Sequence, residues 1–283
     1  MITPDNRLKL LKEKLDQRGF VRIIEAHSGL SALVGDAASF QSENGVVEYD
    51  GLWESSLTDS TTKGLPDIEI ISLDSRINTI NEIMEVSDKP VIVDGDTGRS
   101  PVEFEFLVRR LERLGVSAVI IEDKVFPKRN SLDTSAKQTL EDPVAFGQKI
   151  QRGKSQTLTD EFMIISRLES LIAGTGLEDV LGRAETYIKA GVDGVMIHSQ
   201  KDQHDDILDF AAAYETLCKR LGVRPPLICV PTTYNLTTDV ELAEHGFNIM
   251  IRANHLLRSS YKAMEEAAVS ILAHDRSFES EAV

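Results

Sequence analysis

A short apolar segment near the middle of the chain is followed directly by charged and polar residues. Residues 117–121 read Ser-Ala-Val-Ile-Ile, Glu122 follows them, and the run 123–132 carries Lys, Asn and Ser. Because Val and Ile favour strands, we expect the Glu122 carboxylate at the end of a buried strand and the polar run in a loop. In barrels of alternating strands and helices, such strand ends carry the active site. The segment therefore predicts a metal-binding acid beside a mobile polar loop.

Two further carboxylates lie close together after another strand-like segment. Asp94 directly follows the apolar residues 90–93, and Gly95 separates it from Asp96. With Glu122 they form a set of oxygen ligands, which Mg²⁺ prefers while it keeps several waters for a substrate. A plain turn is the alternative interpretation, because Asp-Gly sequences often form turns. The position of Glu122 at the next strand end favours the magnesium site.

An arginine and a histidine also follow apolar, strand-like segments. The guanidinium of Arg167 can bind a carboxylate or a phosphate through two parallel hydrogen bonds, although an ion pair with Glu169 or Glu122 is the alternative. His198 is a candidate general acid or anion-binding donor near neutral pH, and a hydrogen-bonded core histidine is its alternative. We expect both side chains on the same rim of the barrel as the three acids.

The N-terminal third of the chain contributes two weaker signals. After Trp53, the serine-rich residues 54–56 can present hydroxyls and backbone N–H groups to an anion, but serine-rich turns are common. Asp67 follows Gly-Leu-Pro in an expected loop, where a turn carboxylate is the ordinary interpretation. These residues by themselves leave both interpretations open.

Strand-like and helix-like segments alternate along the chain, without a linker or a low-complexity segment. In the helix expected from Pro101, apolar residues recur every three or four positions, Ser100 suits the N-cap and Gly115 suits the end. This alternation predicts one (β/α)8 barrel domain over residues 1–283. A doubly wound open sheet is the alternative, but no glycine-rich dinucleotide fingerprint follows the first strand. The expected strands cover residues 21–25, 46–53, 90–94, 117–122, 162–166, 194–197, 227–230 and 247–251.

Charge and composition exclude some classes of partner. The formal net charge is -15, with 46 acidic and 31 basic residues, which argues against non-specific binding to nucleic acid or to an anionic membrane. An anionic small-molecule substrate stays compatible, because a local cation can dominate a site. Cys218 and Cys229 match no zinc or CxxC motif and are expected as buried thiols. No signal-peptide core and no apolar run of about 20 residues is present, so we expect a soluble cytoplasmic protein.

The segments described above occur together in one known family. Their residues resemble the phosphoenolpyruvate mutase family of the isocitrate lyase superfamily, which converts phosphoenolpyruvate to phosphonopyruvate. The resemblance extends from residues 25–32 to residues 252–255, and its most specific parts are residues 94–98, 122–132 and 166–174. It implies an isomerase at the entry step of phosphonate biosynthesis. It also implies a (β/α)8 barrel whose last helix is exchanged between the subunits of a homodimer or homotetramer.

The resemblance further implies a role for each candidate residue. Asp94 would bind Mg²⁺, and Asp96 and Glu122 would act on the metal directly or through its waters. Asp67 would stand near the migrating phosphoryl group, and Lys128 would stabilise the closed form of a gating loop at about residues 123–136. The pyruvyl portion of the substrate would be held by Trp53, by Arg167 and by the backbone around Ser55 and Leu57. The phosphoryl group would be surrounded by Asn130, Ser131, Arg167 and His198.

Other branches of the superfamily are the alternative functions. Phosphonopyruvate hydrolase, which gives pyruvate and phosphate, shares the metal site but tends to carry Thr at the position of Asn130. An Asn amide there can donate to phosphoryl oxygens and fills space that an attacking water would need, which favours the mutase. Carbon–carbon lyases such as isocitrate and methylisocitrate lyases carry a cysteine in the catalytic loop, and residues 123–135 contain none.

The chain also departs from the family pattern at several positions. Glu54 and Ser56 stand where glycine is frequent, and Gly95 stands where alanine is usual. Many members continue beyond the Asn-His element with another helix, whereas this chain ends at Val283. We therefore expect a shortened exchanged element, which leaves the oligomeric state more open than the chemistry.

Overall fold

Eight parallel strands close into a barrel in the computed structural model, which describes residues 2–43, 45–133 and 135–281. The strands are β1 (Val21–Ala26), β4 (Gly51–Glu54), β5 (Val91–Asp94), β6 (Ala118–Glu122), β7 (Met163–Leu168), β8 (Gly194–Ile197), β9 (Leu227–Cys229) and β10 (Phe247–Arg252). Their order around the barrel is β1-β10-β9-β8-β7-β6-β5-β4, with β4 pairing back to β1. The predicted (β/α)8 barrel is confirmed, and the doubly wound open sheet is excluded.

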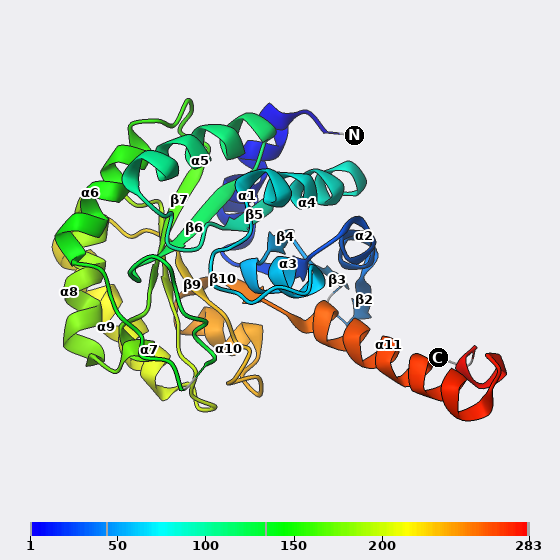
Figure 1. The fold of residues 1–283 in the computed structure, drawn as a ribbon. Coiled ribbons are helices and arrows are strands. Elements are labelled where there is room, and N and C mark those ends of the chain that lie inside the picture. The colour runs from blue at the N-terminus through cyan, green and yellow to red at the C-terminus, as the bar shows by residue number, and fades with distance from the viewer. Residues whose placement is uncertain (1, 44, 134, 282–283) are drawn as a thin grey trace.

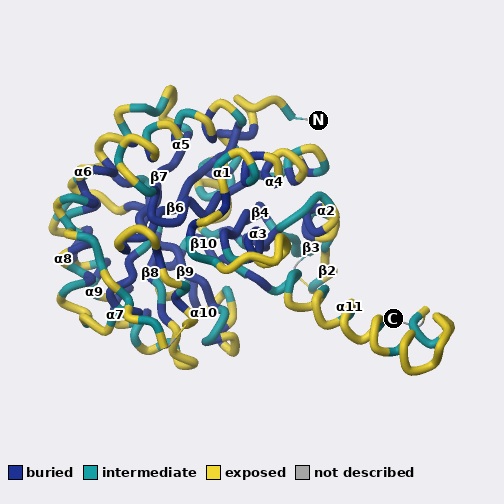
Figure 2. The backbone as a smooth tube through the Cα atoms, viewed as in Figure 1, coloured by how far each residue is buried: buried dark blue, intermediate teal, exposed yellow. Residues whose placement is uncertain are grey.

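Helices surround the barrel and connect its strands, as Figure 1 shows. They are α1 (Pro4–Arg18), α2 (Gly29–Ala37), α3 (Ser56–Thr62), α4 (Leu73–Val86), α5 (Pro101–Leu114), α6 (Pro143–Lys154), α7 (Ser170–Ala173), α8 (Gly176–Lys189), α9 (Asp205–Leu221), α10 (Asp239–Glu244) and α11 (His255–His274), followed by the 3-10 turn η1 (Phe278–Ser280). Figure 2 shows the strands as the buried part of the molecule and the outer turns of the helices as exposed. No helix in the part of the chain that the structure describes is long and apolar enough to cross a membrane.

Helix α5 forms as its sequence predicts. The side chain of Ser100 accepts a hydrogen bond from the Glu103 backbone, and the Glu103 side chain accepts from the Ser100 backbone, which satisfies two otherwise unpaired N–H groups. Phe104 and Val108, one helical turn apart, are buried against the sheet. Gly115 ends the helix with a φ of 87°, a conformation that glycine adopts without the penalty of a side chain.

The expected strand over residues 46–53 is wrong, because the chain turns in the middle of it. Strand β3 (Gly45–Glu48) pairs antiparallel with β2 (Ser39–Ser42) in a separate hairpin, and β4 joins the barrel only from Gly51. Between them, the Asp50 carboxylate is buried, accepts a hydrogen bond from the Arg22 backbone at 2.9 Å and forms an ion pair with Arg18. A buried carboxylate must find donors, and here that need places Asp50 in a bend rather than in a strand.

Alternate residues of the strands point to opposite sides of the sheet and separate the core into two parts. One cluster fills the interior of the barrel and includes Ile23, Ile92, Ile120, Ile165 and Ile251. The other lies between the sheet and the surrounding helices. Because all eight strands run parallel, their carboxyl ends meet on one rim, where Asp94, Glu122, Arg167 and His198 fall at or next to strand ends.

Helix α11 contacts its own barrel at its first turn, where the backbone N–H groups of Leu256 and Leu257 donate to Glu25, and then extends away from it. Figure 1 shows it projecting away from the barrel beyond β10, with the C-terminus at its far end. None of its side chains is buried, and Tyr261, Met264 and Leu272 are among its exposed apolar residues.

Gly95, which stands where the family usually has alanine, lies where a Cβ atom would be crowded. An added Cβ would lie 2.8 Å from the Val119 side chain, 2.9 Å from that of Ile121 and 3.1 Å from the Ile120 carbonyl oxygen. We expect Gly95→Ala to lower the free energy of unfolding by about 1–3 kcal/mol, as overpacked cores do. Denaturant unfolding measures the change.

Gly182 supplies the matched control, because it lies inside α8 and an added Cβ would meet nothing within 4 Å. Gly182→Ala should raise the stability by about 0.5–1 kcal/mol, since it removes backbone freedom from the unfolded chain. Unfolding of Gly95→Ala at the wild-type denaturant concentration would contradict the packing described for β5 and β6.

Candidate active site

A cavity opens at the carboxyl ends of the strands and brings together residues that are far apart in the sequence. The predicted site residues on its wall are Trp53, Ser55, Leu57, Asp67, Asp94, Lys128, Asn130, Ser131, Arg167 and His198. Ser56, Leu132, Met196, Ser199, Val230, Thr232, Thr233, Ala253 and Asn254 complete the wall. The two remaining predicted residues, Asp96 and Glu122, lie behind it and contact cavity residues through ion pairs. The barrel therefore gathers the predicted residues on one rim.

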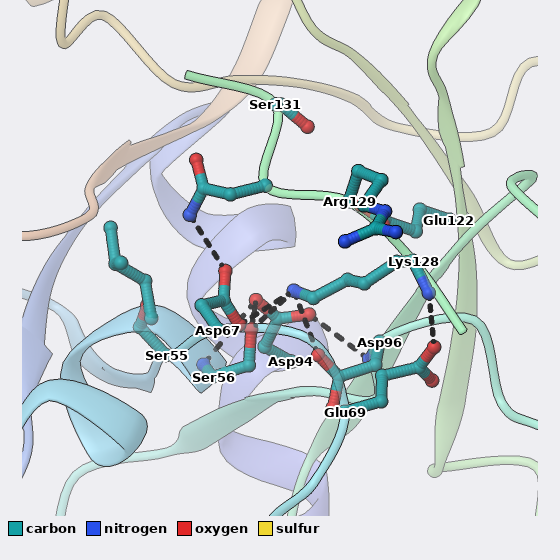
Figure 3. A network of polar contacts seen from close by, with 12 residues as sticks. Ser55, Ser56, Asp67, Glu69, Asp94, Asp96, Glu122, Lys128, Arg129 and Ser131 are labelled. Atoms are coloured by element: carbon teal, nitrogen blue, oxygen red, sulfur yellow. Dashed lines mark hydrogen bonds and ion pairs between the residues drawn. The ribbon is translucent and has the colours of Figure 1, made fainter. Parts of the chain in front are cut away.

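The ammonium group of Lys128 lies at the centre of the polar network in Figure 3. Its Nζ is 2.7 Å from Ser56 Oγ, 2.8 Å from Asp96 Oδ1 and 3.0 Å from Asp67 Oδ1, and the side chain is only 3% exposed. Burial alone would lower the pKa of Lys128, but the nearby carboxylates outweigh it and raise the pKa well above its usual value. Lys128 is therefore a charged group that fixes residues 128–131 over the cavity.

The acids at the end of β5 lie at a turn, in which the Gly98 N–H donates to the Gly95 carbonyl at 2.9 Å, and side-chain hydrogen bonds also hold them. Asp94 Oδ2 accepts from Ser56 Oγ at 2.9 Å, and Asp94 Oδ1 accepts from the Asp96 backbone at 3.1 Å. Asp96 Oδ2 is 2.8 Å from Arg76 Nη1. Burial would raise the pKa of Asp96, but Arg76 and Lys128 hold it below its ordinary value. Asp96 is therefore ionised and already paired with two cations.

Arg167 forms both of the ion pairs that were the alternative interpretation of its sequence position, and it also lines the cavity. It lines the cavity, and its Nη2 lies 2.7 Å from Glu122 Oε2 while its Nε donates to Glu169. Burial raises the pKa of Glu122 to about 7, although Arg167, Lys124 and Lys128 oppose the shift. The guanidinium is thus fixed by two carboxylates and still faces the cavity.

His198 also lines the cavity and is oriented by Glu169. Its Nδ1 is 2.8 Å from Glu169 Oε1. Although burial opposes it, the cations Arg167 and Lys124, together with the neighbouring His198, hold the pKa of Glu169 well below its usual value, so this carboxylate only accepts hydrogen bonds. The proton of a neutral His198 therefore sits on Nδ1, and Nε2 is left as an acceptor. Burial lowers the pKa of His198 below that of a free imidazole.

The carboxylates around the cavity suit a hard cation. Among the described residues, no group of three or more His, Cys, Asp or Glu side chains has the geometry of a complete metal site. Mg²⁺, however, typically takes one or two carboxylates and keeps several waters, and Asp94 is an oxygen donor on the cavity wall. Acidic groups also outnumber the cationic ones: Glu54, Asp67, Glu69, Asp94, Asp96, Glu122 and Glu169 surround Arg76, Lys124, Lys128 and Arg167. The donor set therefore fits a hydrated Mg²⁺ at Asp94.

Several residues of the network were not predicted from the sequence as site residues. The buried Lys124 lies 3.1 Å from Glu169 Oε2 and donates to Ser131 Oγ at 2.5 Å. Lys124 follows Glu122 by two positions and Glu169 follows Arg167 by two, a spacing that places them on the same side of an extended chain and could have suggested them. Nothing in the sequence indicates a role at the site for Arg76, which lies in α4, or for Glu69, which lies between α3 and α4.

The chain is similar over most of its length to known phosphoenolpyruvate phosphomutases. The model of the family described as phosphoenolpyruvate phosphomutase matches residues 11–272. A phosphoenolpyruvate phosphomutase from Tetrahymena pyriformis is 33% identical over 259 residues, which are 91% of this chain and 81% of that protein. The crystal structure of the phosphoenolpyruvate phosphomutase from Streptomyces platensis subsp. rosaceus is 34% identical and has a TM-score of 0.85, covering 95% of this chain and 88% of that one.

A second branch of the same enzymes is also similar. A structure of phosphonopyruvate hydrolase in complex with oxalate and Mg²⁺ is 28% identical, with a TM-score of 0.83 over 98% of this chain and 90% of that one. Both similarities span nearly the whole barrel and include the strands that carry the cavity. The chain belongs to the phosphoenolpyruvate phosphomutase family.

Proposed function

We propose that this protein is a phosphoenolpyruvate mutase, which interconverts phosphoenolpyruvate and 3-phosphonopyruvate at the entry to phosphonate biosynthesis. In the direction from phosphonopyruvate, the bond between C3 and phosphorus breaks and a bond between the enolate oxygen and the same phosphorus forms. Both atoms belong to one pyruvyl unit, so the reaction neither consumes water nor releases phosphate. The proposal rests mainly on one observation: residues 128–131, the covering segment, lie at the cavity and contribute Lys128, Asn130 and Ser131 to its wall. This transfer requires that water be excluded.

The side chains on the cavity wall suit the two ends of such a substrate. Trp53 and the backbone of residues 55–57 would hold the pyruvyl portion, together with Arg167, whose fork of donors matches a carboxylate. Asn130 and Ser131 lie on the covering segment and would bind the phosphoryl group. His198 would join them as a donor when its Nε2 is protonated. Transfer of a loose, metaphosphate-like group depends mainly on positioning and charge stabilisation, and fixed donors on opposite sides of the cavity provide both.

Asp94 is the residue that we expect to hold Mg²⁺, with Asp96 and Glu122 acting on the ion directly or through its waters. When bound, the ion would neutralise charge that develops on the enolate oxygen and the carboxylate, as a Lewis acid. A hydrolase relative whose structure contains oxalate and Mg²⁺ supports this assignment. Asp67, which pairs with Lys128 and accepts from Asn130 at 2.9 Å, would stand beside the migrating group.

Phosphonopyruvate hydrolase is the alternative, because its relatives share the fold and the acid set. Asn130 favours the mutase, since its side chain lies on the cavity wall, where its amide nitrogen donates to Asp67 at 2.9 Å, and occupies space that an attacking water would need. The lyase branch is disfavoured, because residues 123–135 lack a cysteine. Cys218 and Cys229 are both buried free thiols outside the cavity wall, as expected for thiols with a packing role.

The products formed from phosphonopyruvate test the proposal. With Mg²⁺ present, the wild-type protein should give mainly phosphoenolpyruvate, and chelation of the metal should stop the reaction until Mg²⁺ is restored. Asn130→Ala should lose about 10²- to 10³-fold in kcat, the loss seen when one donor to a developing oxyanion is removed, whereas Asn81→Ala, an exposed position on α4, should have no effect. Phosphorus NMR of the product mixture measures each species.

The variant Asn130→Thr separates the two branches. Its shorter side chain leaves room for water, so inorganic phosphate should become a larger share of the product. Inorganic phosphate as the main product of the wild-type protein would show that the chain is a hydrolase. Full activity of metal-free protein would contradict the magnesium assignment.

The protonation state of His198 gives a prediction about pH. Because burial lowers the pKa of His198, we expect the imidazole in the free protein to titrate below about 6.5, the value of an unfolded histidine. Between the two pKa values the unfolded chain binds more protons than the folded one, so this histidine makes the protein less stable as the pH falls through that window. Imidazole proton NMR, assigned with His198→Gln, measures the pKa, and a value above 6.5 would contradict the environment described here.

We also propose that α11 packs against a second copy of the chain. Its apolar side chains at Tyr261, Met264, Ala268, Ile271 and Leu272 recur at helical spacing, and all are exposed. A helix with an apolar stripe needs a surface to cover it, and exchange of an element between identical subunits provides one in a closed dimer. Exposed Leu33 and Val34 of α2 and Phe40 of β2 offer further apolar surface.

Light scattering coupled to size-exclusion chromatography tests this assembly. The wild-type protein should be a dimer or tetramer, and the double variant Met264→Glu/Ile271→Glu should shift it towards the monomer because two charges would enter the contact. Lys262→Glu, on the opposite side of the same helix and 76% exposed, is the control and should leave the mass unchanged. A monomeric wild-type protein at micromolar concentration would contradict the proposal.

A further inference from the structure

Glu69 is a buried carboxylate with no role assigned to it so far. It lies in the segment between α3 and α4, two residues after Asp67, and is only 6% exposed. Its Oε1 accepts from the Thr97 backbone at 3.0 Å and from Thr97 Oγ1 at 2.8 Å. Its Oε2 accepts from the Lys128 backbone N–H at 2.9 Å. One carboxylate thus joins three separate segments of the rim, and Figure 3 shows its contact with Lys128.

The contact with Lys128 differs in kind from the other contacts of the covering segment. Asp67 and Asp96 bind the ammonium group of Lys128 through charged contacts at 3.0 and 2.8 Å. Glu69 instead binds the main-chain N–H of Lys128, which carries no net charge. The position of the backbone therefore depends on Glu69 whatever the partner of the ammonium group.

Arg99 supports Glu69 from the outer side. Its Nη2 donates to the carbonyl oxygens of Glu69 at 2.7 Å and Ile71 at 3.2 Å. Its guanidinium carbon lies 5.7 Å from the centre of the Phe126 ring, within the range of a cation–π contact. Arg99 therefore contacts both the segment between α3 and α4 and Phe126, which lies two residues before Lys128.

The backbone at this junction is held in an uncommon conformation. Glu69, Asp96 and Arg99 have φ values of 60°, 53° and 54°, in the left-handed region that side chains other than Gly, Asn and Asp seldom adopt. Such conformations persist where surrounding contacts hold them, and they gather at functional sites. Here the surrounding contacts are the hydrogen bonds of Glu69 and Arg99.

We propose that Glu69 is a positioning residue that holds residues 126–131 over the cavity through the Lys128 backbone N–H, with Arg99 holding Glu69 in place. Glu69 acts through Lys128 and does not itself line the cavity. Its consequence for catalysis, the exclusion of water during transfer, rests on the proposed mutase function.

Hydrogen exchange of the Lys128 amide tests the contact without any assay of activity. The full-length protein, labelled with ¹⁵N-lysine, is measured alone and with Mg²⁺ and oxalate, and Lys128→Arg serves only to identify the resonance. In Glu69→Gln the amide oxygen should keep the two Thr97 donors, which turns the NH₂ group towards the Lys128 N–H and removes its acceptor. We therefore expect the Lys128 amide to exchange about tenfold faster, as the loss of a hydrogen bond to a charged group implies. Glu82→Gln, an exposed acid on α4, should leave the exchange unchanged.

Arg99→Gln gives a second test at a partly exposed position that folding should tolerate. It should also accelerate Lys128 exchange, but by less than Glu69→Gln, because it removes the support and not the contact. Unchanged Lys128 exchange in a folded Glu69→Gln protein, or unchanged exchange in Arg99→Gln should Glu69→Gln fail to fold, would overturn the proposal.

Product partition then provides the readout that a purely structural role would not alter. With phosphonopyruvate, Glu69→Gln should release a several-fold larger share of inorganic phosphate than the wild-type protein, because water enters more often, and Glu82→Gln should not. An unchanged share despite faster exchange would overturn the role in water exclusion. If the wild-type protein does not turn over phosphonopyruvate, the mutase function fails, and the exchange measurement still decides the role of Glu69.

Discussion

The rim of the barrel depends on one buried charge, the ammonium group of Lys128. Transfer of an ammonium from water to a protein interior is costly unless oxygen atoms replace its hydration. Ser56, Asp67 and Asp96 supply those atoms. Ser56 and Asp67 come from the connection between β4 and β5, and Asp96 comes from the one between β5 and β6. Because the charge must remain paired, the segments that follow β4, β5 and β6 are held in one arrangement.

The same network sets different protonation states for neighbouring acids. Asp96 has two cationic partners, Arg76 and Lys128, so its pKa is held below the ordinary value. Burial is the main cause that raises the pKa of Glu122 to about 7 and the pKa of Glu54 to about 8. Glu54 stands where glycine is frequent in the family, and its nearest cationic atom is Arg76 Nε at 3.7 Å. Acids of one chemical type thereby acquire different properties from their surroundings.

The fold explains how related enzymes carry out different reactions. The barrel strands fix the acids, Arg167 and His198 on a rigid rim, and such rims support many chemistries through changes in their loops. The covering segment contributes Asn130 and Ser131 from above the cavity. We therefore attribute the difference between phosphoryl transfer within the substrate and phosphoryl transfer to water to that segment and to the residues that hold it. The strands are not expected to decide it.

The sequence determined the local features of this protein. The apolar runs before Asp94, Glu122 and His198 correctly identified strand ends, and the caps at Ser100 and Gly115 correctly bounded α5. The same patterns gave the barrel, because parallel strands that alternate with helices have few other ways to bury both faces of a sheet. They failed over residues 46–53, because the β-like composition there is shared by the β2–β3 hairpin and by β4.

Apart from the pairs of Arg167 with Glu122 and Glu169, which the sequence had offered as an alternative, tertiary structure alone decided which charged groups meet. Arg76 on α4 pairs with Asp96. Lys124, which follows β6, pairs with Glu169, which follows the neighbouring strand β7. Glu69, between α3 and α4, accepts a hydrogen bond from the Lys128 backbone. It also decided that α11 leaves its own barrel. Hydrophobic periodicity reports only which face of one element is buried, whereas an ion pair depends on where two distant elements lie after the barrel closes, and the sequence near either partner does not encode that distance.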